Sequence, residues 1–309
     1  MTDEHTKTAS LCRNNRNARC LAMVTLAALT LATGSQAQIV AEEGGGERIN
    51  FAGKLQMLSQ RIGAAACYNH RKIDSGATFI QLITASSEFT LILDALENGS
   101  DQLDIFGAET EPLVLEEVAA LSAIWEPMRA TIDEIVAHGS SDAQIKLIGQ
   151  ESGPLFEKSK DVVTEVSIEY ASPTSLLQAD AIVIGIAGRQ RSLAQNISMN
   201  SCLIASGLAD DSVVEAFQAA MERYEVSALA LSNGMPEAGI NPTDNPEILI
   251  GLDIAMQDWL RVKPALETIA AGGSADDATL ADIFKTMNGL TSQMNSVVGD
   301  YTMDSKLNL

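Results

Sequence analysis

The stretch AGKLQMLSQR, residues 52–61, returns 135 residues later as AGRQRSLAQN, residues 187–196. Between residues 49–68 and residues 184–203, seven of twenty positions are identical at this single offset. Two copies at such a long period indicate a duplicated domain, because solenoid proteins stack many shorter repeats. The fold of one copy should therefore predict the fold of the other.

Apolar residues in the first copy follow a helical period. They step by four and three positions along the chain, which is the core-facing stripe of an amphipathic helix: Phe51, Leu55, Leu58, Ile62 and Ala65. Seven more helices are expected between turn residues, at Ala77–Glu97, Pro112–Ala137, Asp142–Tyr170, Leu176–Ser206, Asp210–Ser232, Pro246–Ala271 and Asp276–Met303. The prediction is an all-α protein of two tandem antiparallel four-helix bundles, residues 47–171 and 175–303.

The joint between the copies, Ala171–Ser175, is too short for a flexible tether. An antiparallel four-helix unit begins and ends at the same end, so we expect the bundles side by side with their first helices parallel and facing. The rival arrangement is end to end. Cys67 and Cys202 occupy equivalent positions on the facing helices, where either a disulfide or two buried free thiols could form; we expect free thiols, because packed helices are usually too far apart for the bond.

Residues 1–37 have the pattern of a secretory signal peptide. Basic residues precede the twelve-residue apolar stretch Leu21–Ala32, and small residues at positions 35–37 suggest cleavage before Gln38. Twelve apolar residues are too few to span a membrane, and no later segment looks long and apolar enough. The sequence thus predicts a periplasmic or secreted protein with no membrane span in the mature chain.

Composition and motifs exclude several classes of function. A formal net charge of −21 argues against nucleic acid and anionic membranes as partners. Neither His70 nor His138 belongs to a Glu-x-x-His pair, and the chain has no haem-attachment motif. Motifs of nucleophilic enzymes and phosphate-binding loops are also missing from the sequence. We therefore expect no metal, no cofactor and no enzymatic activity.

The repeated phrase itself is the candidate site. Gly53 and Gln56 lie on one face of the first helix, and their equivalents in the second copy are Gly188 and Arg191. Glycine inside a helix costs about 1 kcal/mol relative to alanine, so its presence in both copies suggests close approach of another backbone or a ligand. Four cations lie in segments 51–66 and 186–201, which hold no acidic residue: Lys54, Arg61, Arg189 and Arg191. An anion site is favoured over ordinary surface cations.

The phrase resembles the conserved box of the sensory domain shared by type IV pilus chemotaxis transducers (PilJ type) and nitrate/nitrite sensor kinases (NarX type). That box reads approximately Ala-Gly-x-x-Arg-Met-x-Ser-x-Arg. The first copy departs from it at the first arginine, where it has Gln56, but keeps Arg61 at the second. The second copy keeps Arg191 at the first arginine and has Asn196 at the second.

The resemblance implies a periplasmic sensor domain that dimerises through its first helix and holds an anion between two boxes. The ligand-binding positions would be Gly53, Gln56, Gly188 and Arg191, with Arg61 and Arg189 as further candidates. The implied ligand is nitrate or nitrite. One direct arginine instead of two should weaken anion binding or favour a ligand with an uncharged portion.

Members of this family usually continue into a membrane helix and a signalling region, and the sequence contains neither. We therefore expect signalling through a separate periplasmic protein or membrane receptor. The alternative is a ligand-free interaction or scaffold module, in which the box only packs helix against helix.

Overall fold

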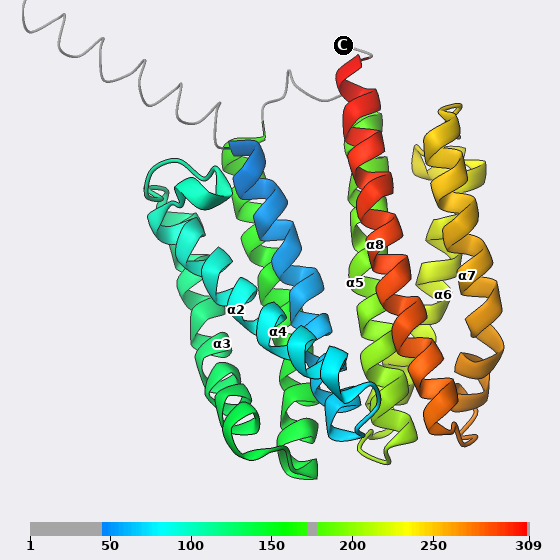
Figure 1. The fold of residues 1–309 in the computed structure, drawn as a ribbon. Helices are drawn as coiled ribbons and strands as arrows, with labels where there is room; N and C mark the ends of the chain where they lie inside the picture. Colours follow the sequence, from blue (N-terminus) through cyan, green and yellow to red (C-terminus); the bar gives the residue numbers. More distant parts are fainter. Residues whose placement is uncertain (1–44, 172–177, 308–309) are drawn as a thin grey trace, which may run out of the picture.

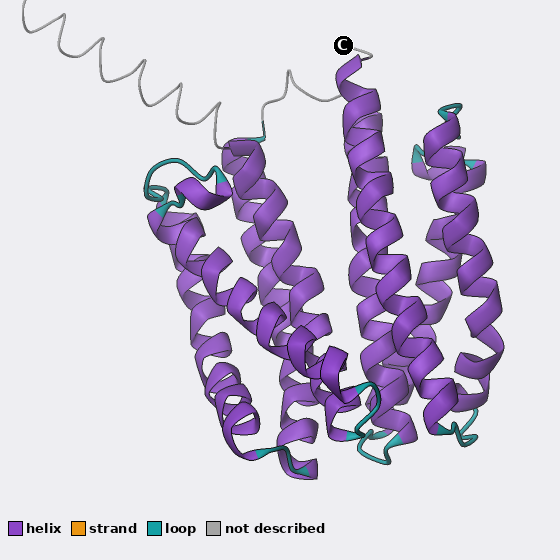
Figure 2. Ribbon diagram, viewed as in Figure 1, coloured by secondary structure: helices purple, strands orange, loops and turns teal. Residues whose placement is uncertain are grey.

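The computed structural model describes residues 45–171 and 178–307 (Figure 1). The predicted signal peptide, with its cleavage site, lies outside the described residues, as does most of the joint between the copies. Within the described ranges the chain forms long helices and no strand, as Figure 2 shows. The predicted all-α class is confirmed.

The first bundle contains the helix of residues 45–70, followed by α2 (Ser75–Asn98), α3 (Pro112–His138) and α4 (Asp142–Tyr170). The second bundle contains α5 (Gln178–Ala205), α6 (Asp211–Asn233), α7 (Pro246–Ala270) and α8 (Asp277–Leu307). Successive helices in each bundle run in opposite directions (Figure 1). The predicted helices are all present, with boundaries that differ by a few residues.

The duplication extends into the loops that follow α2 and α6. Isolated bridges join Ser100 to Ile105 and Met235 to Ile240, which are the same positions at the offset of 135. Gly99 has φ 79°, and a Cβ there would lie 2.6 Å from the carbonyl oxygen of Gly107. No larger residue fits this turn without moving the backbone, which explains the Asn-Gly pair at the end of α2.

The core of each bundle is built around one aromatic pair. The rings of Phe89 and Trp125 lie 4.5 Å apart in the first bundle, and those of Tyr224 and Trp259 lie 4.6 Å apart in the second. All four side chains are buried. The repeated aromatic positions are therefore core residues, and they set the packing between the second and third helix of each unit.

Helix α2 corrects one expectation from the sequence. By length and composition it could cross a membrane, with a mean hydropathy of 1.4 over its most apolar 18 residues, although no such segment was expected after the signal peptide. In the structure it packs inside the first bundle through Leu82, Phe89 and Ile92. Its apolar character is consistent with a core helix.

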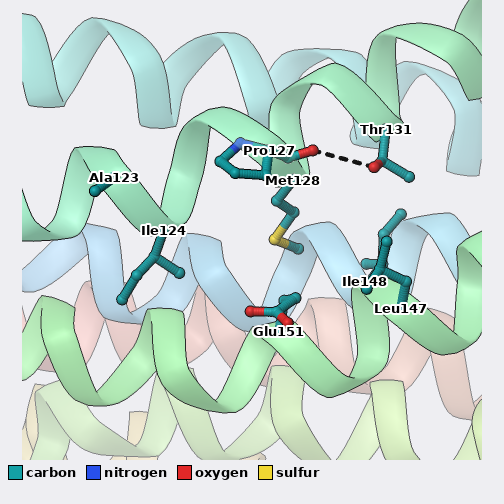
Figure 3. Close-up of a pocket in the computed structure, with 8 residues that line it drawn as sticks. All are labelled: Ala123, Ile124, Pro127, Met128, Thr131, Leu147, Ile148 and Glu151. Carbon is teal, nitrogen blue, oxygen red and sulfur yellow. Dashed lines mark hydrogen bonds between the residues drawn. The ribbon is translucent and has the colours of Figure 1, made fainter.

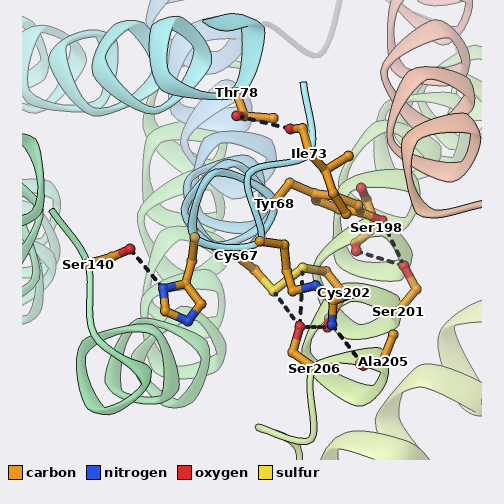
Figure 4. The surroundings of a disulfide bond; sticks show 12 residues. Cys67, Tyr68, Ile73, Thr78, Ser140, Ser198, Ser201, Cys202, Ala205 and Ser206 are labelled. Atoms are coloured by element: carbon orange, nitrogen blue, oxygen red, sulfur yellow. Dashed lines mark hydrogen bonds between the residues drawn. A yellow bond between two sulfur atoms is a disulfide. The ribbon is translucent and has the colours of Figure 1, made fainter. Parts of the chain in front are cut away.

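The bundles lie side by side, and the disulfide Cys67–Cys202 joins them (Figure 4). The two Cα atoms are 6.1 Å apart, so the expectation of free thiols is wrong and the end-to-end arrangement is excluded. Next to the bond, the hydroxyls of Tyr68 and Ser201 share a hydrogen bond of 3.1 Å. In Figure 1 the bundles meet at this end and diverge toward the other.

Candidate functional site

A cleft of about 1890 Å³ separates the two bundles where they diverge. Its walls come from the 45–70 helix and α4 on one side and from α5, α6 and α8 on the other. Five of the six ligand-binding residues expected from the sequence line it: Gly53, Gln56, Gly188, Arg189 and Arg191. The two copies of the repeated phrase thus face one space, as expected for parallel first helices.

A chain of amide hydrogen bonds joins the two helices at the level of Gln60. The Gln60 Oε1 accepts a bond of 2.7 Å from Asn196 Nδ2, and Asn196 Oδ1 accepts one of 3.0 Å from Asn200. Gln60 Nε2 donates in turn to the carbonyl of Ser152 on α4, at 2.8 Å. Gln60, Asn196 and Asn200 also line the cleft, which continues from this contact toward Gln56 and Gly53.

Arg191 is the cation placed nearest to this point on α5. Its Nε donates to the carbonyl of Gly188 at 3.2 Å, and its Nη1 donates to Oδ1 of Asn295 on α8 at 2.6 Å. Burial lowers the pKa of the guanidinium, and no carboxylate of the described residues forms an ion pair with it. A partly desolvated charge held only by neutral acceptors would be stabilised further by an anion.

The two glycines of the phrase leave room for a ligand and for a side chain. A Cβ built at Gly53 meets nothing within 4 Å, so the expected close approach of another backbone is not found there. At Gly188 a Cβ would lie 3.4 Å from Nη2 of Arg191, the only atom within 4 Å. This is an ordinary van der Waals distance, so the packing around neither glycine requires the absence of a side chain.

Arg61 does not line the cleft. It lies within the first bundle, where burial lowers the pKa of its guanidinium and the negative charge of Glu88 on α2 opposes that effect. The same carboxylate forms an ion pair with Lys54. The first copy therefore has an acidic partner for its cations, which the sequence analysis missed because that partner is on another helix.

The other residues that the sequence analysis missed come from helices outside the phrase. Asn295 binds Arg191 from α8, and Arg223 on α6 lines the cleft with Arg189. The repeat offset is the signal that could have found Arg223, because it occupies the position of Glu88 in the first copy. The cleft wall of the second bundle thus has an arginine where the first bundle has an acid.

A smaller pocket of about 290 Å³ lies between α3 and α4 of the first bundle (Figure 3). Its lining is mostly apolar, and its one charged residue is Glu151, so it is unsuited to an anion. Within residues 45–171 and 178–307, no group of three or more histidine, cysteine, aspartate or glutamate side chains is arranged to hold a metal ion. The inter-bundle cleft is the better candidate for a site.

Comparison with known proteins gives one finding for each copy. The family model described as type IV pili methyl-accepting chemotaxis transducer N-term (PilJ) matches residues 40–150 and, separately, residues 174–283. No curated protein matches the chain in sequence. The matched segments begin just before the first helix of each bundle and include both copies of the repeated phrase.

Proposed function

The chain belongs to the PilJ family and contains its transducer N-terminal domain twice, and from this premise we propose that it binds a small anion between its two bundles. The family domain is sensory rather than catalytic, which agrees with the lack of enzyme motifs in the sequence. The tandem copies would supply within one chain the two halves of a site that the family otherwise assembles from two protomers.

The observation that carries this proposal is Arg191. It is a half-buried cation in the wall of the cleft, and among the described residues its side chain donates hydrogen bonds to neutral oxygens alone. Gln56 occupies the equivalent place on the opposite helix and lines the same cleft. An anion bound there would gain charge-assisted hydrogen bonds from one side and amide hydrogen bonds from the other.

Nitrate and nitrite are the ligands we propose first. Each is small and planar, so the guanidinium fork of Arg191 can donate two parallel hydrogen bonds to it. With a single arginine at the site, the affinity should be lower than that of a site with two. Each charge-assisted hydrogen bond contributes about 1.5–3 kcal/mol.

We also propose that the protein is exported and acts through a partner. The first 37 residues have the charge and hydropathy pattern of a signal peptide, and Cys67 and Cys202 form a disulfide, as suits an oxidising compartment. A periplasmic protein or the outer part of a membrane receptor would then recognise whether an anion is bound in the cleft.

A ligand-free scaffold is the second candidate function. The contact between the bundles favours it, because Gly63 packs so closely that a Cβ there would lie 2.3 Å from the sulfur of Met199. In that case the two first helices would serve packing between the bundles alone. The two candidates differ in whether any anion stabilises the protein.

The test is a thermal-shift screen of the mature protein with nitrate, nitrite, sulfate, chloride and amino acids, followed by calorimetry of each ligand that raises Tm. Replacing Arg191 by alanine or glutamine should abolish binding of nitrate or nitrite and leave the helical circular dichroism unchanged. Lys285→Gln is the matched control, since Lys285 is an exposed cation of α8 outside the cleft lining. Undiminished affinity of the Arg191 variants would reject the anion site, and a screen without any shift would favour the scaffold.

A further inference from the structure

One pair of positions is neutral in the first bundle and doubly positive in the second. Lys54 and Glu88 form an ion pair between the 45–70 helix and α2. At the repeat offset of 135, Lys54 corresponds to Arg189 and Glu88 corresponds to Arg223. The second bundle therefore has two guanidinium groups at positions where the first has a cation and its carboxylate.

These two positions are neighbours in the second bundle as well. Gln190, the residue after Arg189, donates from Nε2 to the carbonyl of Tyr224 at 3.1 Å and to the hydroxyl of Ser227 at 2.6 Å. Tyr224 is the residue after Arg223. These hydrogen bonds from the Gln190 side chain join α5 to α6 one residue beyond each arginine, so Arg189 and Arg223 lie on adjoining helices and line the same cleft.

Both arginines are exposed, both line the inter-bundle cleft, and neither forms an ion pair with a carboxylate of the described residues. Two cations at these positions repel each other, and an anion bound between them would relieve that repulsion. The whole chain has a net charge of −21, and most of its surface would repel that anion. Arg189 and Arg223 are thus positively charged residues on a protein whose net charge is negative.

The pair is also distinct from the site at Arg191. Residues 189 and 191 are about 200° apart around α5, since each residue turns the helix by about 100°. Arg191 extends toward α8, where Asn295 accepts its hydrogen bond, whereas Arg189 corresponds to Lys54, whose partner is on the second helix of its bundle. An anion between Arg189 and Arg223 would therefore occupy a second position in the cleft.

We propose that Arg189 and Arg223 form a second anion site, which takes a tetrahedral dianion of the phosphate or sulfate class. Two guanidinium groups match a charge of −2 and offer ten N–H donors in two planar forks, more than a planar monoanion can accept. The same chemistry would recognise a free inorganic ion or the phosphate group of an organic monoester. This site does not depend on binding of nitrate or nitrite at Arg191.

The test is titration calorimetry of the mature protein with inorganic phosphate, sulfate and glycerol phosphate. Arg223→Glu recreates the ion pair of the first bundle, so the variant should fold, and Arg223→Gln removes one charge without adding another. Lys285→Gln is the matched control for the loss of a positive charge. Glycerol phosphate binding tighter than phosphate would identify an organic monoester as the better ligand, and the reverse order would identify the inorganic ion.

We expect phosphate and sulfate to bind the parent and the control equally, and to bind Arg223→Gln at least tenfold more weakly. Arg223→Glu should not bind them measurably, while Arg191→Gln should bind them as the parent does. Equal phosphate affinity in the parent and Arg223→Glu, or no phosphate binding by the parent, would overturn the second site. Loss of phosphate binding in Arg191→Gln would also overturn it, because the two sites would then be one.

Discussion

Arg48 in the first bundle is buried beside a carboxylate, whereas Arg191 in the second bundle is half-buried and forms no ion pair with a carboxylate of the described residues. Arg48 is 3% exposed; its Nη1 donates to Glu109 at 3.2 Å and to the carbonyl of Leu96 at 2.9 Å. The guanidinium also lies 5.2 Å from the centre of the Tyr170 ring. Among the described residues, the Arg191 side chain in the second bundle donates hydrogen bonds only to Gly188 and Asn295.

The two arginines do not occupy equivalent positions in the repeat. Val183 and Ser305 stand where the first bundle has Arg48 and Tyr170, and Gln56 stands where the second has Arg191. The first copy has a closed ionic cluster, and the second copy has an open cation at the cleft. Removing one partner of a buried ion pair destabilises a fold, whereas a half-buried charge without a counter-ion can take that counter-ion from a ligand.

The largest effect should come from breaking the closed cluster. Arg48→Met leaves Glu109 buried without its counter-ion, and this should lower the free energy of unfolding by about 3–5 kcal/mol. Denaturant unfolding followed by circular dichroism measures it. Arg129→Met is the control, because Arg129 is an exposed cation of α3 paired only with carboxylates of its own helix, and its loss should hardly move the midpoint. Equal midpoints for the two variants would contradict the assigned role of Arg48.

The next largest effect should come from removing the disulfide, which links the two bundles. Replacing Cys67 and Cys202 by serine removes a crosslink that closes 135 residues of chain, and such losses cost about 2–4 kcal/mol. Denaturant unfolding of the parent and the double variant gives the difference. Mass spectrometry after alkylation with and without reduction shows whether the exported parent carries the bond. A parent fully alkylated before reduction would rule it out.

The smallest effect should come from restoring symmetry at the cleft. Gln56→Arg places a second arginine opposite Arg191, as in the family box, so nitrate should bind roughly tenfold more tightly, which corresponds to about 1.4 kcal/mol. Calorimetry of the parent and the variant gives the ratio. Unchanged or weaker nitrate binding would show that Gln56 does not reach the bound anion.

Much of the fold could be predicted from the sequence, because helical periodicity and the turn residues repeat in both copies. The bond between Cys67 and Cys202 could not, since the separation of two facing helices depends on how closely small side chains let them approach. For the candidate site, the repeated phrase led to Gln56 and Arg191, both of which line the cleft. It could not reveal Glu88, whose pairing with Lys54 depends on the packing of α2.

The most direct test of anion binding between the bundles is a crystal structure of the mature protein grown with nitrate. The predicted result is a nitrate ion in the cleft, within hydrogen-bonding distance of the Arg191 guanidinium and facing Gln56. A well-ordered Arg191 that still contacts only Gly188 and Asn295 at a saturating nitrate concentration would contradict it.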